Sequence, residues 1–138
     1  MQPDRLRQLF KPESVALFGA STVDGALGTV ILENIKAGGF RGPITLVNPK
    51  YEEIDGEPCY PSLAESGREA ELAVIVAPAK VVPDIISDCG EAGVGAAIVI
   101  SAGFSEAGPQ GLALESAMLR RAKRYGMRIL GPNCLGVI

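Results

Sequence analysis

The sequence predicts a doubly wound α/β fold: a mainly parallel, five-stranded sheet with helices on both faces, in a Rossmann-like arrangement. Short apolar runs alternate along the chain with longer stretches whose apolar residues recur at helical spacing. One run, ELAVIVAP at 71–78, is almost continuously apolar, which is typical of a strand covered on both faces. Aromatic residues make up only 5% of the chain and Trp is absent, so Val, Ile, Leu and Ala must form the core.

The N-terminal elements are a short helix, a strand and a longer helix. The helix at 3–10 stops before Pro12, and the strand VALF follows at 15–18. The longer helix, at 27–37, ends at the glycine pair 38–39, because glycine readily adopts the left-handed conformation that closes a helix. Its inner face is predicted to include Val30, Ile31 and Ile35.

The middle of the chain gives two strands and a helix. The second strand is PITLVNP at 43–49, and the third is the apolar run described above. Between them, residues 51–65 form a turn-rich connection with a single helical turn near Ser62. A helix at 80–92 follows, with Gly93 behind it. Its apolar side is predicted to consist of Val81, Val82, Ile85, Ile86 and Cys89.

The last third of the chain repeats the alternation. GAAIVISAGF at 95–104 is the fourth strand, a helix at 110–125 ends at Gly126, and RILGPN at 128–133 is the fifth strand. With 138 residues, the chain suits one domain, 1–138. Because it stops just beyond its last strand, we expect this domain to be a fragment of a larger multidomain chain.

Composition and charge narrow the function classes. The net charge of −3 gives no general attraction to nucleic acid, and no apolar stretch approaches the roughly 18 residues of a membrane span. The three cysteines are far apart and include no C-x-x-C pair, which argues against a zinc site and for a reducing, cytoplasmic setting. The absence of histidine excludes Ser-His-Asp and Cys-His catalysis and any His-ligated metal within the chain.

The segments that follow the five strands are predicted to form a binding edge. In a doubly wound sheet, ligands bind beyond the carboxyl ends of the strands. Here those ends are small, polar or rich in Pro and Gly: GAST at 19–22, NPKY at 48–51, VAPAK at 76–80, SAGFSEAG at 101–108 and GPNC at 131–134.

The loop after the first strand is a candidate phosphate site. The strand–loop–helix order would place Ser21, Thr22 and the following N–H groups against a phosphate at the helix N-terminus. The dinucleotide signature G-x-G-x-x-G is broken, because its second and third glycines are replaced by Ser21 and Asp24, with glycines at 25 and 28 instead. The alternative is an ordinary βα loop whose glycines serve only turn geometry and packing.

The end of the second strand favours a nucleotide that carries a ribose phosphate. NAD-binding domains have an acidic residue here, whereas this chain has Asn48, with Lys50 two residues later. A lysine attracts a ribose phosphate and a carboxylate repels one, so the residues point to NADP or to coenzyme A (CoA). The alternative is that Lys50 is an ordinary surface lysine.

The remaining strand ends carry weaker signals. Pro78 would stiffen the rim, and Val76 and Ala77 could offer flat contacts to an adenine or a pantetheine-like arm, although a plain strand-to-helix turn fits them equally well. Glu106 has no paired group for acid–base catalysis, and Cys134 has no basic partner to activate its thiol, so no catalytic residue and no metal site are predicted. The basic cluster LRRAKRY at 119–125 suits a helix C-terminus.

Together, several motifs resemble one family over nearly the whole chain. They are FKPESVALFGAS, GALGTVILENI, VNPKYEEIDGEPCYPSL, LAVIVAPAK, AAIVISAGFSEAG and RILGPNCLGVI. The chain resembles the N-terminal CoA-binding domain of NDP-forming (ADP-forming) acyl-CoA synthetases, which are relatives of the succinyl-CoA synthetase α subunit and include acetyltransferase-fused forms.

The resemblance selects CoA over NADP and implies roles for individual residues. The loop residues Gly19, Ser21 and Thr22 would contact the pyrophosphate, and Lys50, beside Asn48, would contact the phosphorylated ribose. The first loop is longer than in succinyl-CoA synthetase, which leaves the contacts from Val23 to Gly28 open. The other cofactor-binding residues would be Val76, Ala77 and Pro78, which flank the cofactor, Ser101, Ala102 and Gly103 in a later turn, and Asn133 near the thiol. Gly28, at the end of the first loop, is also predicted to bind the cofactor.

The resemblance also implies a reaction. In the family, a nucleoside triphosphate drives formation of an acyl phosphate, a histidine of the following domain relays the phosphoryl group, and CoA accepts the acyl group. This chain has neither that histidine nor an ATP-grasp domain, so we expect it to present the CoA thiol and to be inactive alone. Its expected partners are CoA and the other domains of the synthetase, with a homo-oligomer left open. The alternatives are a stand-alone CoA-binding regulatory module and an NADP-binding redox domain.

Overall fold

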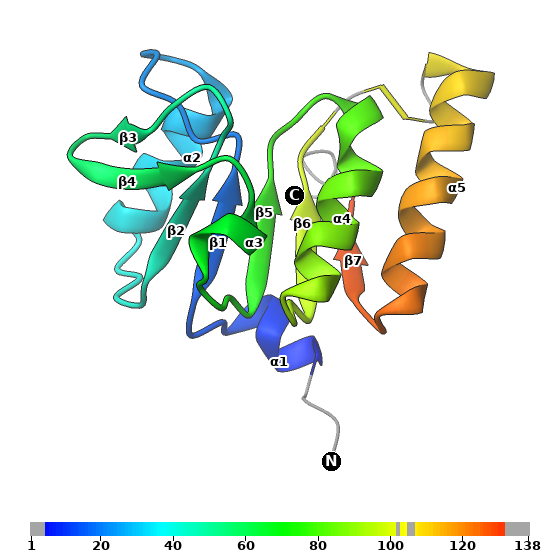
Figure 1. Ribbon diagram of the computed structural model, residues 1–138, viewed down its shortest axis with the longest axis horizontal. Helices are drawn as coiled ribbons and strands as arrows, with labels where there is room; N and C mark the ends of the chain where they lie inside the picture. The colour runs from blue at the N-terminus through cyan, green and yellow to red at the C-terminus, as the bar shows by residue number, and fades with distance from the viewer. Residues whose placement is uncertain (1–4, 102, 105–106, 132–138) are drawn as a thin grey trace.

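The sheet contains seven strands, and its strand order places β1 at the centre (Figure 1). The computed structural model describes residues 5–101, 103–104 and 107–131. The order is β3-β4-β2-β1-β5-β6-β7, and every neighbouring pair is parallel except β3–β4. The strands are β1 (Val15–Phe18), β2 (Ile44–Val47), β3 (Glu53–Ile54), β4 (Glu57–Tyr60), β5 (Leu72–Ile75), β6 (Ala96–Val99) and β7 (Arg128–Leu130).

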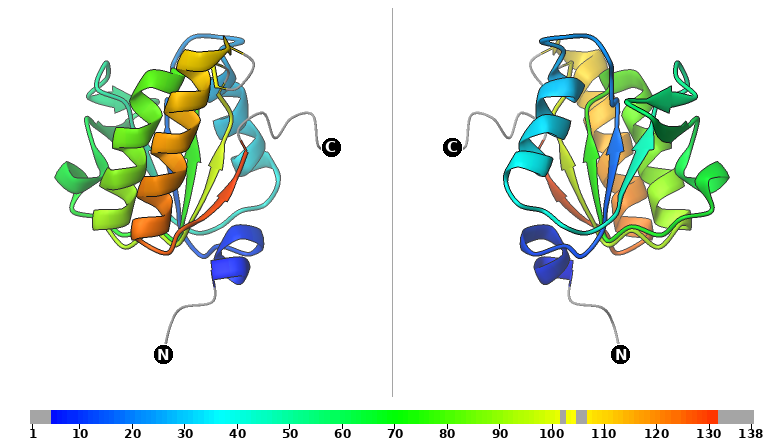
Figure 2. Two further views of the ribbon diagram at one scale, coloured as in Figure 1. Left: turned by 90° about the vertical axis from the view of Figure 1, so that its right-hand side faces the viewer. Right: turned by 90° about the vertical axis from the view of Figure 1, so that its left-hand side faces the viewer.

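Helices cover both faces of the sheet, as predicted. Figure 2 shows α2 on one face and α4 with α5 on the other, while α1 lies below the amino ends of the strands. None of the described helices is long and apolar enough to cross a membrane. The helical segments are α1 (Arg5–Phe10), α2 (Leu27–Ala37), α3 (Leu63–Ser66), the 3-10 helix η1 (Ala79–Val81), α4 (Val82–Glu91) and α5 (Pro109–Arg124).

The fold class is confirmed, but the prediction of five strands is wrong. The connection at 51–65 contains a β-hairpin, β3–β4, and β4 adds to the edge of the sheet beside β2. The hairpin turns at Asp55 and Gly56, which have φ angles of +51° and +81°. An Asp-Gly pair favours a turn with two positive φ angles, so the sequence did carry a signal for this hairpin. The helical turn predicted near Ser62 is α3, and Ser62 caps it by accepting a hydrogen bond from the Glu65 N–H.

The core consists of two aliphatic layers, one on each face of the sheet. The layer under α4 and α5 includes Phe18, Ile75 and Met118, and the layer under α2 includes Leu17 and Leu46. In β1 and β5 every residue is buried, as the continuous apolar runs predicted.

The two helix faces predicted from sequence need small corrections. In α2, Leu32 is buried whereas Val30 is 39% exposed, because the helix turns Leu32 rather than Val30 toward the sheet. On the other face Val81 is 40% exposed, because it belongs to η1, before α4 begins to pack. Cys89, on α4, is buried and unpaired, and burial raises the pKa of its thiol, which makes it a poor nucleophile.

An ion pair at the amino end of the sheet joins α1 to Glu71, the residue that precedes β5. Arg7 donates two hydrogen bonds to the Glu71 carboxylate, at 3.1 and 2.6 Å, and the Glu13 N–H donates a third at 2.9 Å. The hydrogen bond from Arg7 lowers the pKa of Glu71 below its usual 4.5. A carboxyl whose pKa is depressed by folding stabilises the protein above its unfolded-state pKa, and this contribution is lost as the pH falls through the folded-state pKa.

We therefore expect Glu71→Gln to lower the free energy of unfolding by about 1 kcal/mol at pH 7 and to have progressively less effect below about pH 4.5. Urea unfolding of both proteins between pH 3 and pH 7 measures this difference, with the other carboxyl groups common to both. Glu57→Gln is the control, because the ion pair of Glu57 in the described part of the chain is with the exposed Lys36, at 3.2 Å. An effect of Glu71→Gln that is no larger than that of Glu57→Gln, or that is independent of pH, would contradict the prediction.

Candidate functional site

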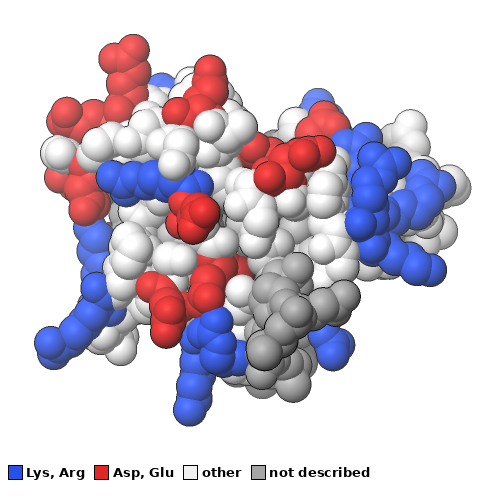
Figure 3. Space-filling view, turned by 60° about the horizontal axis from the view of Figure 1, so that its bottom comes forward, with Lys and Arg blue, Asp and Glu red and all other residues white. Residues whose placement is uncertain are grey.

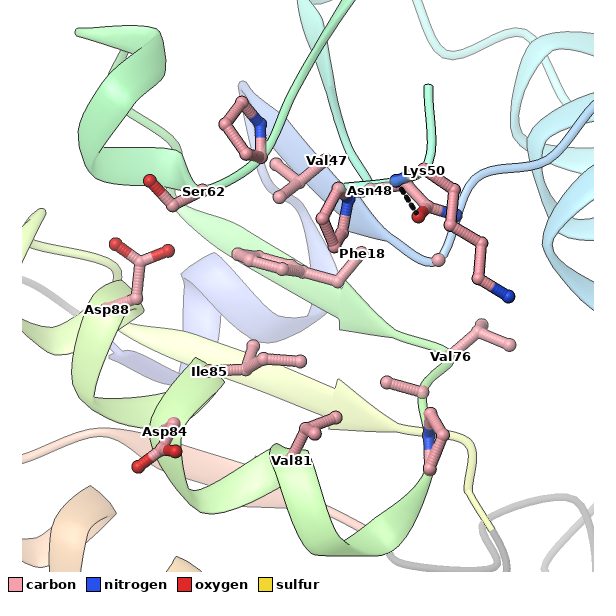
Figure 4. A pocket seen from close by; sticks show the side chains of 15 residues that line it. Phe18, Val47, Asn48, Lys50, Ser62, Val76, Val81, Asp84, Ile85 and Asp88 are labelled. Carbon is pink, nitrogen blue, oxygen red and sulfur yellow. Dashed lines mark hydrogen bonds between the residues drawn. The ribbon is translucent and has the colours of Figure 1, made fainter. Parts of the chain in front are cut away.

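A cavity of about 690 Å³ lies beyond the carboxyl ends of β1, β2 and β5 (Figure 4). The chain leaves β1 toward β2 on one side and later places β5 on the other, so the cavity lies where the strand order reverses. Such a switch point is the general ligand-binding position in doubly wound sheets. The lining residues come from the ends of these three strands, the start of α3 and the first turns of α4: Phe18, Gly19, Val47, Asn48, Pro49, Lys50, Pro61, Ser62, Val76, Ala77, Pro78, Val81, Asp84, Ile85 and Asp88.

Gly19 allows the three strand ends to converge. Its N–H donates to the Val47 carbonyl at 2.9 Å, and its φ angle of +94° is one that side chains rarely tolerate. A Cβ atom at this position would run into the Val76 carbonyl oxygen. The glycine is therefore needed for close approach of β1 to β5, and it also lines the cavity.

Gly28, which is also predicted to bind the cofactor, lies at the start of α2. It is buried there, and a Cβ atom at this position would run into the Gly19 carbonyl oxygen. Gly28 does not line the cavity, so its visible role is close packing of the helix against the first strand end.

The loop from Gly19 to Ala26 is held in place by the hydroxyl groups of Ser21, within the loop, and of Thr29, on α2. Ser21 Oγ accepts a hydrogen bond from the Val23 N–H at 3.0 Å. Thr29 Oγ1 donates to the carbonyl oxygens of Ser21 and Val23, at 2.9 and 2.8 Å. The residue that caps α2 is Ala26, which has no side-chain group to satisfy the first N–H groups of the helix. No side chain at the cap position therefore competes with an anion for these N–H groups, as the phosphate hypothesis requires.

Asn48 joins the loops that follow β1 and β2. Its Nδ2 donates to the Ala20 carbonyl at 2.8 Å, and its Oδ1 accepts from the Lys50 N–H at 3.0 Å. Both ends of the amide are thus engaged within the protein. Asn48 lines the cavity, but its geometry is that of a clamp that fixes the position of Lys50.

The other predicted site residues divide into three groups. Val76, Ala77 and Pro78 line the cavity. Ser101 is buried outside it and accepts a hydrogen bond from the Ala77 N–H at 3.3 Å, which fixes the end of β5, and Gly103 and Thr22 are also not among the lining residues. Ala102 and Asn133 lie outside the described residues, as do Glu106 and Cys134.

The 3-10 helix η1 and the helix α4 together supply a wall of the cavity that the sequence interpretation missed. Val81, Asp84, Ile85 and Asp88 line the cavity and are spaced like one face of a helix. Both carboxylates already have protein partners. Asp88 accepts from the N–H groups of Leu63 and Ala64 at the start of α3, and Asp84 pairs with Arg121 at 2.6 Å.

The cavity is electrostatically uneven as a result. Figure 4 shows the Lys50 side chain at one end, near Val76, and the two carboxylates at the other, with Phe18 and Ile85 between them. Lys50 is exposed and forms no ion pair with any described residue. The arrangement suits a ligand with an apolar or aromatic body and an anionic group beside Lys50. Within the described ranges, no group of three or more Cys, Asp or Glu side chains could hold a metal ion.

Tyr51 makes a further contact beside the site that the sequence interpretation did not include, although neither Tyr51 nor Ser21 is among the lining residues. Its hydroxyl lies 3.4 Å from Ser21 Oγ, and its ring packs partly buried against the core layer under α2. Hydrogen bonds from Ser21 and then Thr22 lower the pKa of Tyr51. The sequence places Tyr51 directly after the predicted site residue Lys50, which could have drawn attention to it. The contact between its hydroxyl and Ser21, 30 residues away, was not predictable from that position.

The comparison with known families decides the identity of the domain. The model of a family described as a CoA binding domain matches residues 13–138. The chain belongs to this CoA-binding domain family. The recognition made from the sequence motifs is thereby confirmed, and CoA is the cofactor of the family.

Relatives of the domain occur in larger proteins and in shorter ones. The chain is 47% identical over 133 residues to "Acetate--CoA ligase [ADP-forming] I" of Archaeoglobus fulgidus, which aligns with 96% of this chain and 19% of the ligase. It resembles a dinucleotide-forming acetyl-coenzyme A synthetase 1 of Ca. Korarchaeum cryptofilum, solved in an apo form, with a TM-score of 0.85, 42% identity, and coverage of 93% of this chain and 28% of that one. A conserved hypothetical protein of Pyrococcus furiosus is also similar, with a TM-score of 0.69 and 27% identity. The similar region covers 91% of this chain and 97% of the Pyrococcus furiosus chain. The CoA-binding domain therefore spans only about a fifth of the ligase.

Proposed function

We propose that CoA binds in the cavity at the carboxyl ends of β1, β2 and β5. The pyrophosphate would lie at the loop that contains Gly19, Ser21 and Thr22, and the phosphorylated ribose would lie beside Lys50. The residues from Val76 to Pro78 would flank the cofactor. The observation that carries this proposal is the position of Lys50 at the cavity, next to the loop from Gly19 to Ala26, called the glycine loop below. Lys50 is exposed and has no ion pair among the described residues, and the cavity beside it is largely apolar.

Titration calorimetry with CoA, dephospho-CoA, NADP and NAD tests this assignment. We expect CoA to bind most tightly, and Lys50→Ala to weaken CoA about 10-fold or more because a charge-assisted contact to the ribose phosphate is lost. Lys50→Ala should leave the affinity for dephospho-CoA nearly unchanged.

Lys123→Ala is the matched control. Lys123 lies in the last turn of α5, together with other basic residues. Figure 3 shows basic side chains gathered on one side of the face that it draws. The position of Lys123 suits the negative end of the helix dipole and is remote from the cavity. If Lys123→Ala and Lys50→Ala had equal effects, or if CoA and dephospho-CoA bound equally well to the wild-type chain, the role given to Lys50 would be wrong. Binding of NADP without CoA would instead support the redox alternative.

We further infer that the chain serves as the CoA-binding part of an ADP-forming acyl-CoA synthetase. Its task would be to present the CoA thiol to an acyl phosphate formed on other domains. The similarity to a much longer ADP-forming ligase supports this inference. The roles given to Ser101, Ala102, Gly103 and Asn133, the presence of further domains in the same protein and a cytoplasmic setting remain predictions.

A stand-alone CoA-binding module is the second candidate. The Pyrococcus furiosus protein supports it, because a similar fold there accounts for 97% of the solved chain. Assays of the purified chain with CoA, ATP and acetate separate the candidates when they are repeated with the remaining parts of a related synthetase. Acetyl-CoA formation that depends on this chain would favour the synthetase role, and CoA binding without any such activity would favour the module.

A further inference from the structure

The turn that carries Lys50 is attached to the glycine loop at both of its ends. At the first end, the Asn48 amide donates to the Ala20 carbonyl at 2.8 Å. At the other end, the Tyr51 hydroxyl lies 3.4 Å from Ser21 Oγ. The turn is itself closed by the Tyr51 N–H, which donates to the Asn48 carbonyl at 3.2 Å. Lys50 therefore projects from a short turn whose two ends both contact the glycine loop.

The Tyr51 contact joins directly to the hydrogen bonds that fold the glycine loop. Ser21 Oγ accepts from the Val23 N–H at 3.0 Å, and the Ser21 carbonyl accepts from Thr29. The phenol ring is packed against the core layer under α2, so its hydroxyl has little freedom to follow the loop if the loop moves. A shift of Ser21 relative to Tyr51 would change the distance from the loop to Lys50.

We propose that Tyr51 is a positioning residue that sets the spacing between the glycine loop and Lys50. The inference rests on the proposed function, in which the loop holds the pyrophosphate and Lys50 holds the ribose phosphate. These two groups are joined through the ribose of CoA, so one ligand molecule can reach both contacts only over a limited range of separations. The protein gains most from both contacts when its two segments are held within that range. The lowered pKa of Tyr51 agrees with hydrogen bonding of its hydroxyl to the hydroxyl groups of the loop.

The test compares affinities for CoA and dephospho-CoA in variants of the 138-residue chain. Tyr51→Phe keeps the packed ring and removes only the hydroxyl. We expect it to weaken CoA roughly 3- to 10-fold, as for one lost hydrogen bond, and to reduce the preference for CoA over dephospho-CoA. In a Lys50→Ala background, Tyr51→Phe should not change that preference further, because the positioned group is gone.

Tyr125→Phe is the matched control. The Tyr125 hydroxyl also makes a side-chain hydrogen bond, to Glu91 at 2.7 Å, but Tyr125 packs on Gly90 of α4 and not at the cavity. Its removal should leave the preference for CoA unchanged. Ser21→Ala removes the other partner of the contact and should reproduce the loss of preference, which keeps the test decisive if Tyr51→Phe folds poorly.

The results separate the possible failures. The positioning role would be overturned if both Tyr51→Phe and Ser21→Ala left the preference for CoA unchanged. It would also be overturned if Tyr51→Phe lowered the affinities for CoA and dephospho-CoA by equal factors. Failure of the wild-type chain to prefer CoA would overturn the proposed function itself, and would be seen before any Tyr51 variant is measured.

Discussion

Replacing Gly19 by Ala should lower the free energy of unfolding by about 3 kcal/mol or more and abolish measurable CoA binding. Two costs combine at this position. The φ angle of +94° is unfavourable for any side chain, and the new Cβ would overlap the Val76 carbonyl oxygen. Relief of this overlap requires β1 and β5 to separate at the carboxyl ends that form the cavity. Urea unfolding measures the loss of stability, and calorimetry under conditions where the variant is folded measures CoA binding.

Gly25→Ala separates the two costs. Gly25 lies in the same loop with a φ angle of +80°, but no atom lies within 4 Å of the position that its Cβ would occupy. This variant should therefore lose only the backbone contribution, about 1–2 kcal/mol. An equal loss in Gly19→Ala and Gly25→Ala would show that the contact between Gly19 and Val76 does not limit the approach of the strands.

The order of the main strands and helices was predictable from the sequence because it depends on local patterns. The continuous apolar runs mark β1 and β5, and the glycines at 38–39 mark the end of α2. The hairpin β3–β4 was missed because its strands are only two and four residues long and are largely exposed. Their pairing is set by the Asp55–Gly56 turn and by the edge of β2, and neither the length nor the apolar pattern of the segment suggests strands.

The candidate site was predictable only where its residues follow a strand directly. Gly19, Lys50 and Val76 could be placed at one edge of the sheet from the strand order alone. The α4 wall was missed because the side chains at 84 and 88 look like ordinary exposed acids in the sequence. Their engagement depends on contacts to Arg121 and to the N–H groups of Leu63 and Ala64, which are 24 to 37 residues away along the chain.

For Asn48, the position in the sequence and the contacts in the structure lead to different expectations for the same substitution. By position, Asn48 replaces the acidic residue of NAD-binding domains, so Asn48→Asp would be the obvious change to gain NAD binding. By contact, the change removes the donor to the Ala20 carbonyl and places a carboxylate against that oxygen, 2.8 Å from the present nitrogen. Loss of this partly buried hydrogen bond, together with the repulsion, should cost about 1–3 kcal/mol of stability.

We expect Asn48→Asp to weaken CoA binding by about 10-fold or more and to create no affinity for NAD, because Lys50 and the glycine loop lose their common anchor. Calorimetry with CoA and NAD, together with urea unfolding, checks both parts of the expectation. Asn34→Asp is the matched control, since Asn34 is exposed on α2 and the same change there should alter neither quantity by more than a few tenths of a kcal/mol. NAD binding by Asn48→Asp would mean that Asn48 faces the ribose and recognises it directly. Loss of CoA binding without any gain would mean that the amide acts by holding the loops that follow β1 and β2 together.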